Sequence, residues 1–487
     1  MNYEQALNAI DDILRKESGC SSEIDYVEQT SWILFLKYLD DLEKEKDAEA
    51  ILTGKNNEHI IEPPFCWHDW AAPLLPNGDN DLVNAMTGDD LAEFVSARLF
   101  PYLKSFKQKA VSPQTLEYKI GEVFDELHNK ITSGYNLREI LWKVNELHFQ
   151  TAADRHEMSI LYENRLNRMG NAGRNGGEYY TPRPLISTIV KVVKPKIGET
   201  VYDPACGSAG FLCEAYQYME EQWRKTNSVD NRRILQESTF LGKEKKGLAY
   251  IIGTMNLIFH GLEAPKIIHT NTLSENLAAV QSKDQHHVIL ANPPFGGKER
   301  GEVQHNFTIN SSETAYLFMQ HFMRYLKPGG RAGIVIKNTF LSNTDNASIA
   351  IRRMLLETCN LHTILDLPSG VFQGAGVKTV VLFFEKGKPT ENIWYYQLNL
   401  DRNLGKTNPL TETDLADFLA LQATKAESEN SWTINVNDLD SDTIDLSVKN
   451  PNRNDEVQLR EPKEIITEMQ QLNNESAALL KQIMEEL

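Results

Sequence analysis

Apolar residues divide the chain into a helical first third and a region of alternating strands and helices behind it. Up to about residue 150 the apolar positions recur at the spacing of amphipathic helices and leave no long strand pattern. One such helix is indicated by Trp32, Ile33, Phe35, Leu36 and Leu39. The pattern therefore predicts an all-α N-terminal domain over residues 1–160.

The pattern of apolar residues changes at a glycine-rich connector, Gly170–Gly177, which holds four glycines in eight residues. Behind it, short apolar runs alternate with helical stretches. This alternation is typical of a parallel sheet covered by helices on both faces, and it predicts an α/β domain over residues 161–400. The predicted strands are Thr200–Tyr202, Thr239–Gly242, Lys266–His269, Val288–Ala291, Arg331–Ile336, Leu361–Leu367 and Thr379–Glu385.

After about residue 400 the pattern weakens into a polar region that ends in an amphipathic helix. Its apolar stripe advances in alternating steps of four and three residues, which is typical of a helix that packs along another helix. The stripe consists of Ile465, Met469, Leu472, Leu479 and Ile483, with Ser476 in the missing place. We predict a C-terminal extension over residues 401–487, whose last helix docks either on its own chain or on a partner.

The charge balance bears on binding partners. The 487 residues include 50 Lys and Arg against 68 Asp and Glu, a formal net charge of −18. A protein that grips nucleic acid by itself usually carries a basic surface, because phosphate contacts dominate the affinity. If this chain works on nucleic acid, a local basic patch or a partner must supply the grip. Improved solubility is the alternative explanation of the acidic balance.

Cysteines and apolar runs exclude several other classes. The five cysteines are odd in number and show no CxxC spacing, so we expect neither a disulfide framework nor a zinc site. No apolar run approaches the ~20 residues of a membrane helix. The first residues lack the basic and then apolar pattern of a secretory signal. We expect a cytoplasmic protein without membrane contact.

Two weak signals of a ligand site lie at predicted strand ends. At Asp203 a strand gives way to a turn with Gly207 and Gly210, where a ligand can approach the backbone and the first amides of the next helix. Glu244 ends the following strand, where open nucleoside-binding sheets carry an acid for the ribose hydroxyls. Each signal alone has a simpler explanation, a packing turn and a solvated acid respectively.

The strongest signal is the run Asn292, Pro293, Pro294 and Phe295, directly after an apolar strand. Prolines stiffen the turn and carry no N–H, so their carbonyls accept hydrogen bonds without a competing donor. The Asn292 side chain adds another acceptor. Two such acceptors can bind both hydrogens of an exocyclic amine such as that of adenine, which frees its lone pair to attack an electrophile. Phe295 offers a face for stacking the base. An ordinary tight turn is the alternative.

In this order the three signals resemble the amino-methyltransferases that use S-adenosylmethionine. The preceding segment GEYYTPRP, Gly177–Pro184, narrows the resemblance to the methylation subunit of type I restriction-modification systems. Further similar segments are Ser31–Asp41, Tyr325–Asn338 and Leu367–Lys386, so the resemblance spans nearly the whole chain. It implies the S-adenosylmethionine-dependent methyltransferase fold, doubly wound around a mostly parallel seven-stranded sheet, with an all-α N-terminal domain and a C-terminal helical tail.

The resemblance also implies methylation of adenine N6 in double-stranded DNA, with the target base flipped out of the helix. The turn Asn292–Phe295 would hold and activate the adenine. The implied cofactor-binding residues are Glu178, Tyr179, Tyr180, Thr181, Pro182, Arg183, Asp203, Ser208, Ala209, Gly210, Glu244 and Asn271. Asn271 stands where the family often has an aspartate, and its oxygen can still accept a hydrogen bond from the cofactor's adenine amine.

No basic, aromatic-rich block for reading DNA follows the last predicted strand. The resemblance implies that a separate specificity subunit reads the DNA and binds two methylation subunits, and that restriction subunits join this core. The C-terminal helix is our candidate for docking on the specificity subunit. The polar loop Gly296–Tyr316 either closes over DNA or cofactor, or is disordered.

Two other functions stay open. Methylation of a protein glutamine amide also uses an Asn-Pro-Pro-aromatic turn, but usually with tyrosine in place of Phe295 and without the GEYYTPRP segment. A scaffold that keeps the fold without catalysis is the second alternative. The intact turn Asn292–Phe295 and Glu244 argue against a scaffold.

Overall fold

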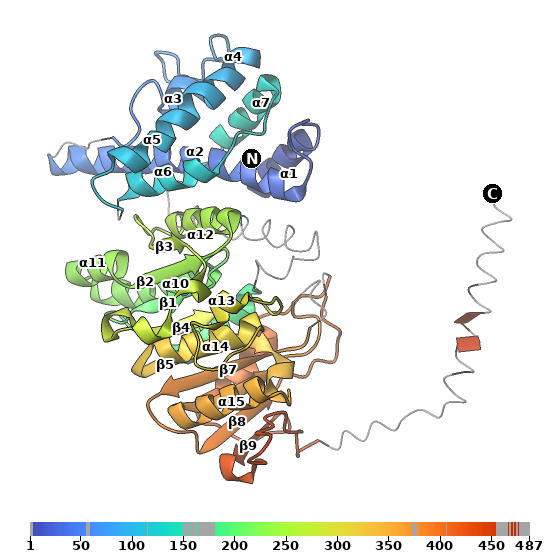
Figure 1. Cartoon of the computed structure of the whole chain (residues 1–487). Helices are drawn as coiled ribbons and strands as arrows, with labels where there is room; N and C mark the ends of the chain where they lie inside the picture. Colours follow the sequence, from blue (N-terminus) through green and yellow to red (C-terminus); the bar gives the residue numbers. More distant parts are fainter. Residues whose placement is uncertain are drawn as a thin grey trace.

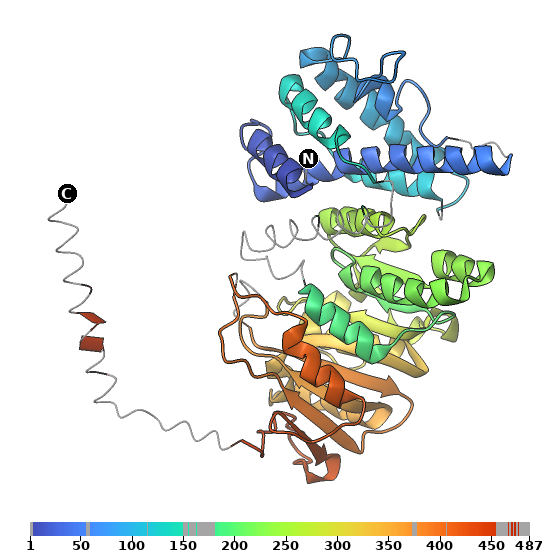
Figure 2. The same cartoon turned by 180° about the vertical axis from the view of Figure 1, so that it is seen from behind.

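The computed structural model describes residues 3–54, 59–113, 115–149, 181–372, 377–405 and 407–453, and single positions at 154, 162, 466, 469, 470, 472, 473 and 476. Figure 1 shows a helical part and a sheet-based part joined end to end, with the helical part beside α12 and β3. The view from behind shows the same stacking (Figure 2). None of the helices in the described ranges is long and apolar enough to span a bilayer.

The described residues between 3 and 149 form helices and no strand. The helices are α1 Tyr3–Leu14, α2 Glu23–Thr53, α3 Trp67–Trp70, α4 Gly88–Glu93, the π-helix η1 Phe94–Leu99, α5 Phe100–Lys109, α6 Leu116–Glu126 and α7 Gly134–Asn145. A capping box between Ser22 and Asp25 starts α2. Aromatic side chains such as Trp32 and Phe100, whose rings meet edge to face at 5.2 Å, fill the core between the helices.

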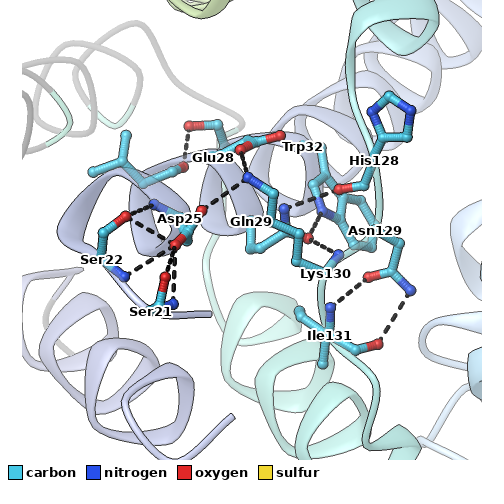
Figure 3. Close-up of polar contacts among 12 residues, drawn as sticks. Ser21, Ser22, Asp25, Glu28, Gln29, Trp32, His128, Asn129, Lys130 and Ile131 are labelled. Atoms are coloured by element: carbon cyan, nitrogen blue, oxygen red, sulfur yellow. Dashed lines mark hydrogen bonds and ion pairs between the residues drawn. The ribbon is translucent and has the colours of Figure 1, made fainter. Parts of the chain in front are cut away.

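A polar cluster fixes the irregular segment between α6 and α7 against the start of α2 (Figure 3). The Lys130 ammonium donates to Asp25 at 2.8 Å and to Glu28, and the Lys130 amide donates to Gln29 Oε1 at 3.0 Å. Gln29 Nε2 donates in turn to the carbonyl of His128 at 3.0 Å. Because this segment lacks regular secondary structure, these side chains supply partners that a helix or strand would otherwise provide.

Replacing Lys130 with methionine is expected to lower the unfolding free energy of the helical part by ~1–2 kcal/mol, because Asp25 and Glu28 lose their shared cation. The effect stays moderate because a third of the Lys130 side chain is exposed. Native-state hydrogen exchange of residues 128–133 measures it. The matched control is Lys107→Met, whose partner Asp125 is half exposed, and it should change stability by less than ~0.5 kcal/mol.

The same cluster makes the helical part sensitive to acid. Partial burial works to raise the pKa of Asp25, but hydrogen bonds from Lys130, Ser21 and Ser22 outweigh it and hold this pKa well below its usual range. The stabilisation is therefore complete above the unfolded pKa of about 3.9 and is lost as the pH falls through the folded pKa. In Lys130→Met the folded pKa of Asp25 should lie closer to its unfolded pKa, so the loss of stability should be smaller and should be complete at a higher pH. Identical acid profiles for both proteins would contradict this explanation.

The helical part rests on α12, Gly247–Phe259, which is buried from Ala249 to Phe259. Such an all-round apolar helix belongs between two layers of structure. Tyr38 of α2 donates to the carbonyl of Ile258 at 2.9 Å and packs edge to face on Phe259. The Tyr250 hydroxyl donates to Glu122 of α6 at 2.7 Å. These contacts join the helical part to the sheet-based part.

The second part is built on one sheet in the order β3-β2-β1-β4-β5-β7-β6-β8-β9. Its strands are β1 Val201–Asp203, β2 Phe240–Glu244, β3 Ile267–His269, β4 His286–Ala291, β5 Leu326–Lys337, β6 Cys359–Asp366, β7 Thr379–Lys386, β8 Asn392–Gln397 and β9 Ser431–Asn435. β1 to β5 are mutually parallel, and β7 lies antiparallel between β5 and β6. The predicted α/β fold is thus confirmed, and all seven predicted strands are present.

The sheet is larger than the seven strands predicted, because β8 and β9 extend it beyond β6. The aromatic run Ile393–Tyr396 within β8 is a strand pattern that the sequence analysis overlooked. β9 is a five-residue edge strand in a polar region, where periodicity is too short to detect. It lies in the predicted extension 401–487, so part of that extension completes the sheet.

Helices cover both faces of the sheet. They are α9 Arg183–Val193, α10 Gly210–Thr226, α11 Val229–Glu237, α12, α13 Gly301–Gln304, α14 Thr314–Tyr325, α15 Asn346–Thr358 and α16 Ala416–Gln422. The alternating residues of β4 separate the two cores. Val288 and Leu290 join the core that contains α9, α10, α12 and α16, whereas Ile289 and Ala291 join the core of α14 and α15.

Helix α9 lies unusually close to the sheet. A methyl group added at Gly333 of β5 would come within 2.5 Å of Ile189 Cγ2, so only glycine permits this approach. Arg331, also on β5, donates to the carbonyls of Val193 and Lys194 at 2.9 and 3.1 Å, which fixes the end of α9. Because α9 is held in this way, the residues that precede it come to the carboxyl ends of the strands.

The structure bears differently on two further predictions, those for the loop 296–316 and for the C-terminal helix. The loop 296–316 is folded and contains α13, so the expectation of disorder is wrong. Gln320 of α14 exchanges two hydrogen bonds of 2.8 Å with the backbone of Ile309, which fastens this loop. Closure over DNA stays a prediction. In the C-terminal helix, Ile465, Leu479 and Ile483 lie outside the described residues, while Met469 and Leu472 are helical and exposed.

Candidate functional site

The predicted polar residues gather at one edge of the sheet. Asp203 ends β1, Glu244 ends β2, and Asn292 follows β4 directly. These three strands are parallel neighbours in the order β2-β1-β4, so their carboxyl ends meet at the same edge. This is the edge where open α/β sheets bind their ligands.

The turn after β1 is held in a conformation that few residues adopt. The Asp203 carboxylate accepts a hydrogen bond from the Ala205 amide at 3.0 Å. Gly207 and Ala209 both have left-handed backbones, with φ of +52° and +61°. For the alanine this conformation is strained, and such strain is often found at functional sites. The turn leads directly into the first amides of α10.

Glu244 organises this turn from the next strand. One carboxylate oxygen accepts from the Gly207 amide at 2.9 Å, and the other accepts from the Lys246 amide at 2.8 Å. A carboxylate offers about four lone-pair sites, so acceptor capacity remains beside the glycine turn. Glu244 can therefore hold the turn and bind a pair of ligand hydroxyls at the same time.

Asp203 differs from Glu244 because it is almost fully buried, at 1% exposure. Burial raises the pKa of Asp203 well above its usual range; the Ala205 amide opposes this shift and the charge of Glu244 adds to it. A carboxyl group in this environment supports the turn through hydrogen bonding rather than through charge.

The Asn292 side chain has one end anchored and the other end free. Its Nδ2 donates to Thr181 Oγ1 at 2.9 Å. Its Oδ1 is buried and has no hydrogen-bond partner among the described residues. Most buried polar atoms in proteins are paired, so an unpaired acceptor points to a ligand that donates to it. Thr181, which the sequence predicted to bind cofactor, thus contacts the predicted catalytic asparagine.

Phe295 pairs with a residue that the sequence analysis did not assign to the site. Its ring meets Phe372 edge to face, with 5.1 Å between the centroids and 86° between the planes. Phe372 lies in the segment Leu367–Lys386, which matched the family, but nothing in the sequence indicates that it meets Phe295. Together the two rings form an aromatic corner next to the Asn292 turn.

Other predicted residues lie near the edge but use their polar groups differently. Arg183 donates to Glu214 of α10 at 3.2 Å, which ties α9 to α10. Asn271 Oδ1 accepts from the Leu273 amide at 3.3 Å and caps the short helix η3, Thr272–Ser274. Its predicted contact with the cofactor stays a prediction.

The remaining predicted site residues lie at the ends of helices and strands. Pro182 caps α9, and Gly210 starts α10 beside Ile186. The Ser208 carbonyl accepts from Asn256 Nδ2 at 2.9 Å. Pro293 and Pro294 follow Asn292 at the end of β4. Glu178, Tyr179 and Tyr180 lie outside the described residues.

The sheet order and the polar strand ends together define a methyltransferase fold. Residues 153–459 match the family model described as N-6 DNA Methylase, and residues 3–144 match that of the HsdM N-terminal domain. The chain therefore belongs to the N-6 DNA methylase family, as a methylation subunit of the type I restriction-modification kind and an adenine-specific DNA methyltransferase.

Curated relatives agree with this assignment. The methylase subunit of the type I restriction enzyme EcoEI from Escherichia coli is 33% identical, and the match covers 99% of this chain and 97% of that protein. The EcoKI methylase subunit from Escherichia coli strain K12 is 32% identical over 65% of this chain and 64% of that protein.

Solved structures agree as well. The modification subunit of a type I restriction enzyme from Vibrio vulnificus YJ016 has 37% identity and a TM-score of 0.82, covering 93% of this chain and 98% of that one. A chain from a structure of type I R-M system assembly has 36% identity and a TM-score of 0.77, covering 98% and 96% respectively. These similarities favour DNA methylation over glutamine methylation or a scaffold role.

Proposed function

We propose that this chain transfers the methyl group of S-adenosylmethionine to N6 of a flipped adenine in double-stranded DNA, with catalysis by the turn Asn292–Phe295. The observation that carries this proposal is the Asn292 amide. Its nitrogen is anchored, and its buried oxygen lacks a partner among the described residues, on a turn stiffened by two prolines. This geometry suits a group that accepts hydrogen bonds from a reacting amine.

The residues around the glycine turn fit the nucleoside part of the cofactor. Glu244 has acceptor capacity left for the two ribose hydroxyls, and the left-handed turn at Gly207 lets a ligand approach the backbone. When bound there, S-adenosylmethionine supplies an electrophilic methyl group on a sulfonium. The amides at the start of α10 favour the negative end of the cofactor's amino-acid portion.

Asn292 and Pro293 activate the target. The Asn292 Oδ1 and the Pro293 carbonyl accept the two hydrogens of the adenine amine and favour a tetrahedral nitrogen, so the lone pair becomes available. The rings of Phe295 and Phe372 meet edge to face. We place the target base beside these two rings. No general base is needed before the attack, because the proton leaves from the cationic product. Extracting the base from the helix costs a few kcal/mol.

We infer that partners supply much of the affinity for DNA. Its net charge is −18, and a chain this acidic binds phosphates poorly on its own. The relatives are named as subunits of restriction enzymes. We therefore infer a cytoplasmic complex in which a specificity subunit reads DNA and carries two of these methylation subunits, with restriction subunits attached to the same core.

The test is to purify this chain together with its specificity subunit and incubate the complex with double-stranded DNA and S-adenosylmethionine that carries a labelled methyl group. Mass spectrometry of the digested DNA should find the label in N6-methyladenine. The same complex without DNA serves as a control for protein methylation. Label in a protein glutamine, or in no product at all, would overturn the proposal.

A further inference from the structure

The peptide unit between Lys245 and Lys246 is held at both of its polar ends. Its N–H donates to Glu244 Oε1 at 2.8 Å, and its carbonyl accepts from His269 Nε2 at 3.1 Å. A peptide unit is planar, so its C=O and its N–H point in opposite directions and can only turn together. The His269 side chain therefore also fixes the direction of the N–H that the Glu244 carboxylate binds.

His269 continues the sheet contacts beyond the point where the backbone supplies them. The paired register of β2 and β3 ends with Glu244 opposite His269, and the Thr270 amide donates to the Glu244 carbonyl at 2.8 Å. The next carbonyl, that of Lys245, accepts from the His269 side chain instead. Because a carbonyl can only accept, Nε2 must carry a hydrogen, which makes His269 the donor in this contact.

The His269 ring is itself held between the two parts of the molecule. Tyr250 in the first turn of α12 stacks on it, with 5.3 Å between the centroids and 14° between the planes. The Tyr250 hydroxyl is tied to Glu122 of α6, and Glu126 at the end of α6 places a carboxylate oxygen 3.8 Å from His269 Nδ1. A methyl group added at Gly247 would come within 3.2 Å of Glu126, so glycine permits this close approach. The ring is thus presented to the peptide in a defined orientation.

We propose that His269 is a positioning residue for the cofactor: it holds the peptide that follows Glu244, and so keeps the Glu244 carboxylate oriented toward the ribose hydroxyls. The inference rests on the proposed function of Glu244 in binding the cofactor. His269 acts through Glu244, so its loss weakens the binding of S-adenosylmethionine and leaves the chemical step at saturating cofactor unchanged. The Nε2–H group carries this role, and the stacking on Tyr250 supports it.

The test compares His269→Phe with His269→Gln in the complex with the specificity subunit. His269→Phe keeps an aromatic ring beside Tyr250 but removes the donor, and should raise the calorimetric dissociation constant for S-adenosylmethionine about 5- to 10-fold, the loss expected for one net hydrogen bond. His269→Gln places an amide N–H at about the position of Nε2, and should keep this constant within about twofold of the original. The single-turnover rate at saturating cofactor should stay within about twofold in both variants.

The control is His68→Phe on α3, the same substitution at an exposed histidine beside Asp40, and it should leave the dissociation constant unchanged. An unchanged constant in His269→Phe would overturn the inference. Equal weakening in the phenylalanine and glutamine variants would do so as well, because the role would then belong to the ring and not to its N–H. An unchanged constant in Glu244→Ala would instead overturn the proposed function of Glu244 itself.

Discussion

Asn292→Ala is expected to slow methyl transfer by roughly 10²–10³-fold, the loss typical when one preorganised hydrogen-bonding group is removed from a reacting centre. The Asn292 oxygen is the acceptor left unpaired at the carboxyl end of β4. Without it the adenine amine keeps its lone pair conjugated with the ring. Binding of S-adenosylmethionine should be unaffected, because Glu244 and the glycine turn belong to β2 and β1. Single-turnover methylation and calorimetry measure the two quantities.

A matched control for this variant is Asn276→Ala. Asn276 is exposed, caps the short helix η4, Leu277–Ala279, and lies away from the carboxyl end of β4. Its replacement should leave the single-turnover rate unchanged. If Asn292→Ala forms N6-methyladenine at the original rate, the asparagine is not the acceptor, and the turn Asn292–Phe295 has only a structural role.

The sequence was sufficient to predict the central strands, because each of them combines a short apolar run with a clear polar end. Val288–Ala291 is one example: four apolar residues stop at Asn292, so the position of the strand end and the candidate chemistry are read together. Parallel strands then bring such ends to one edge without any knowledge of side-chain packing. β8 and β9 were missed for other reasons: the aromatic run Ile393–Tyr396 of β8 was overlooked, and β9 is a short edge strand in a polar region.

Contacts between distant segments could not be read in the same way. Thr181 meets Asn292 because α9 packs on Gly333, and the sequence does not reveal that Gly333 lies beneath Ile189. Phe372 meets Phe295 for a similar reason, since β6 and β4 are separated in the sheet by β5 and β7. Motif comparison places such residues near a site, whereas the partner of each side chain depends on tertiary packing.

The two elements that bind the cofactor in our proposal, Glu244 at the end of β2 and the glycine turn after β1, are not independent of each other. Glu244 on β2 accepts the amide of Gly207 in the turn after β1, so the acid shapes the turn as well as facing the ligand. Cofactor affinity should therefore be more sensitive to this single side chain than a contact with ribose alone would imply. The geometry of the turn depends on a carboxylate at this position, because both of its oxygens accept hydrogen bonds from backbone amides.

Glu244→Ala is accordingly expected to raise the dissociation constant for S-adenosylmethionine by about 10- to 100-fold, as hydrogen bonds to a charged group contribute ~1.5–3 kcal/mol. Glu244→Gln should also weaken binding, because its NH2 group would face one of the amides of Gly207 and Lys246. At saturating cofactor the methylation rate should recover, since Glu244 lies on β2, away from the Asn292 turn.

Calorimetry of the complex and its methylation rate against cofactor concentration separate these two effects. The control is Glu237→Ala at the exposed end of α11, which should change neither quantity. An unchanged dissociation constant in Glu244→Ala would remove the acid from the cofactor site. A rate that stays low at saturating cofactor would show instead that the glycine turn, once released by Glu244, also misplaces the methyl group relative to the target nitrogen.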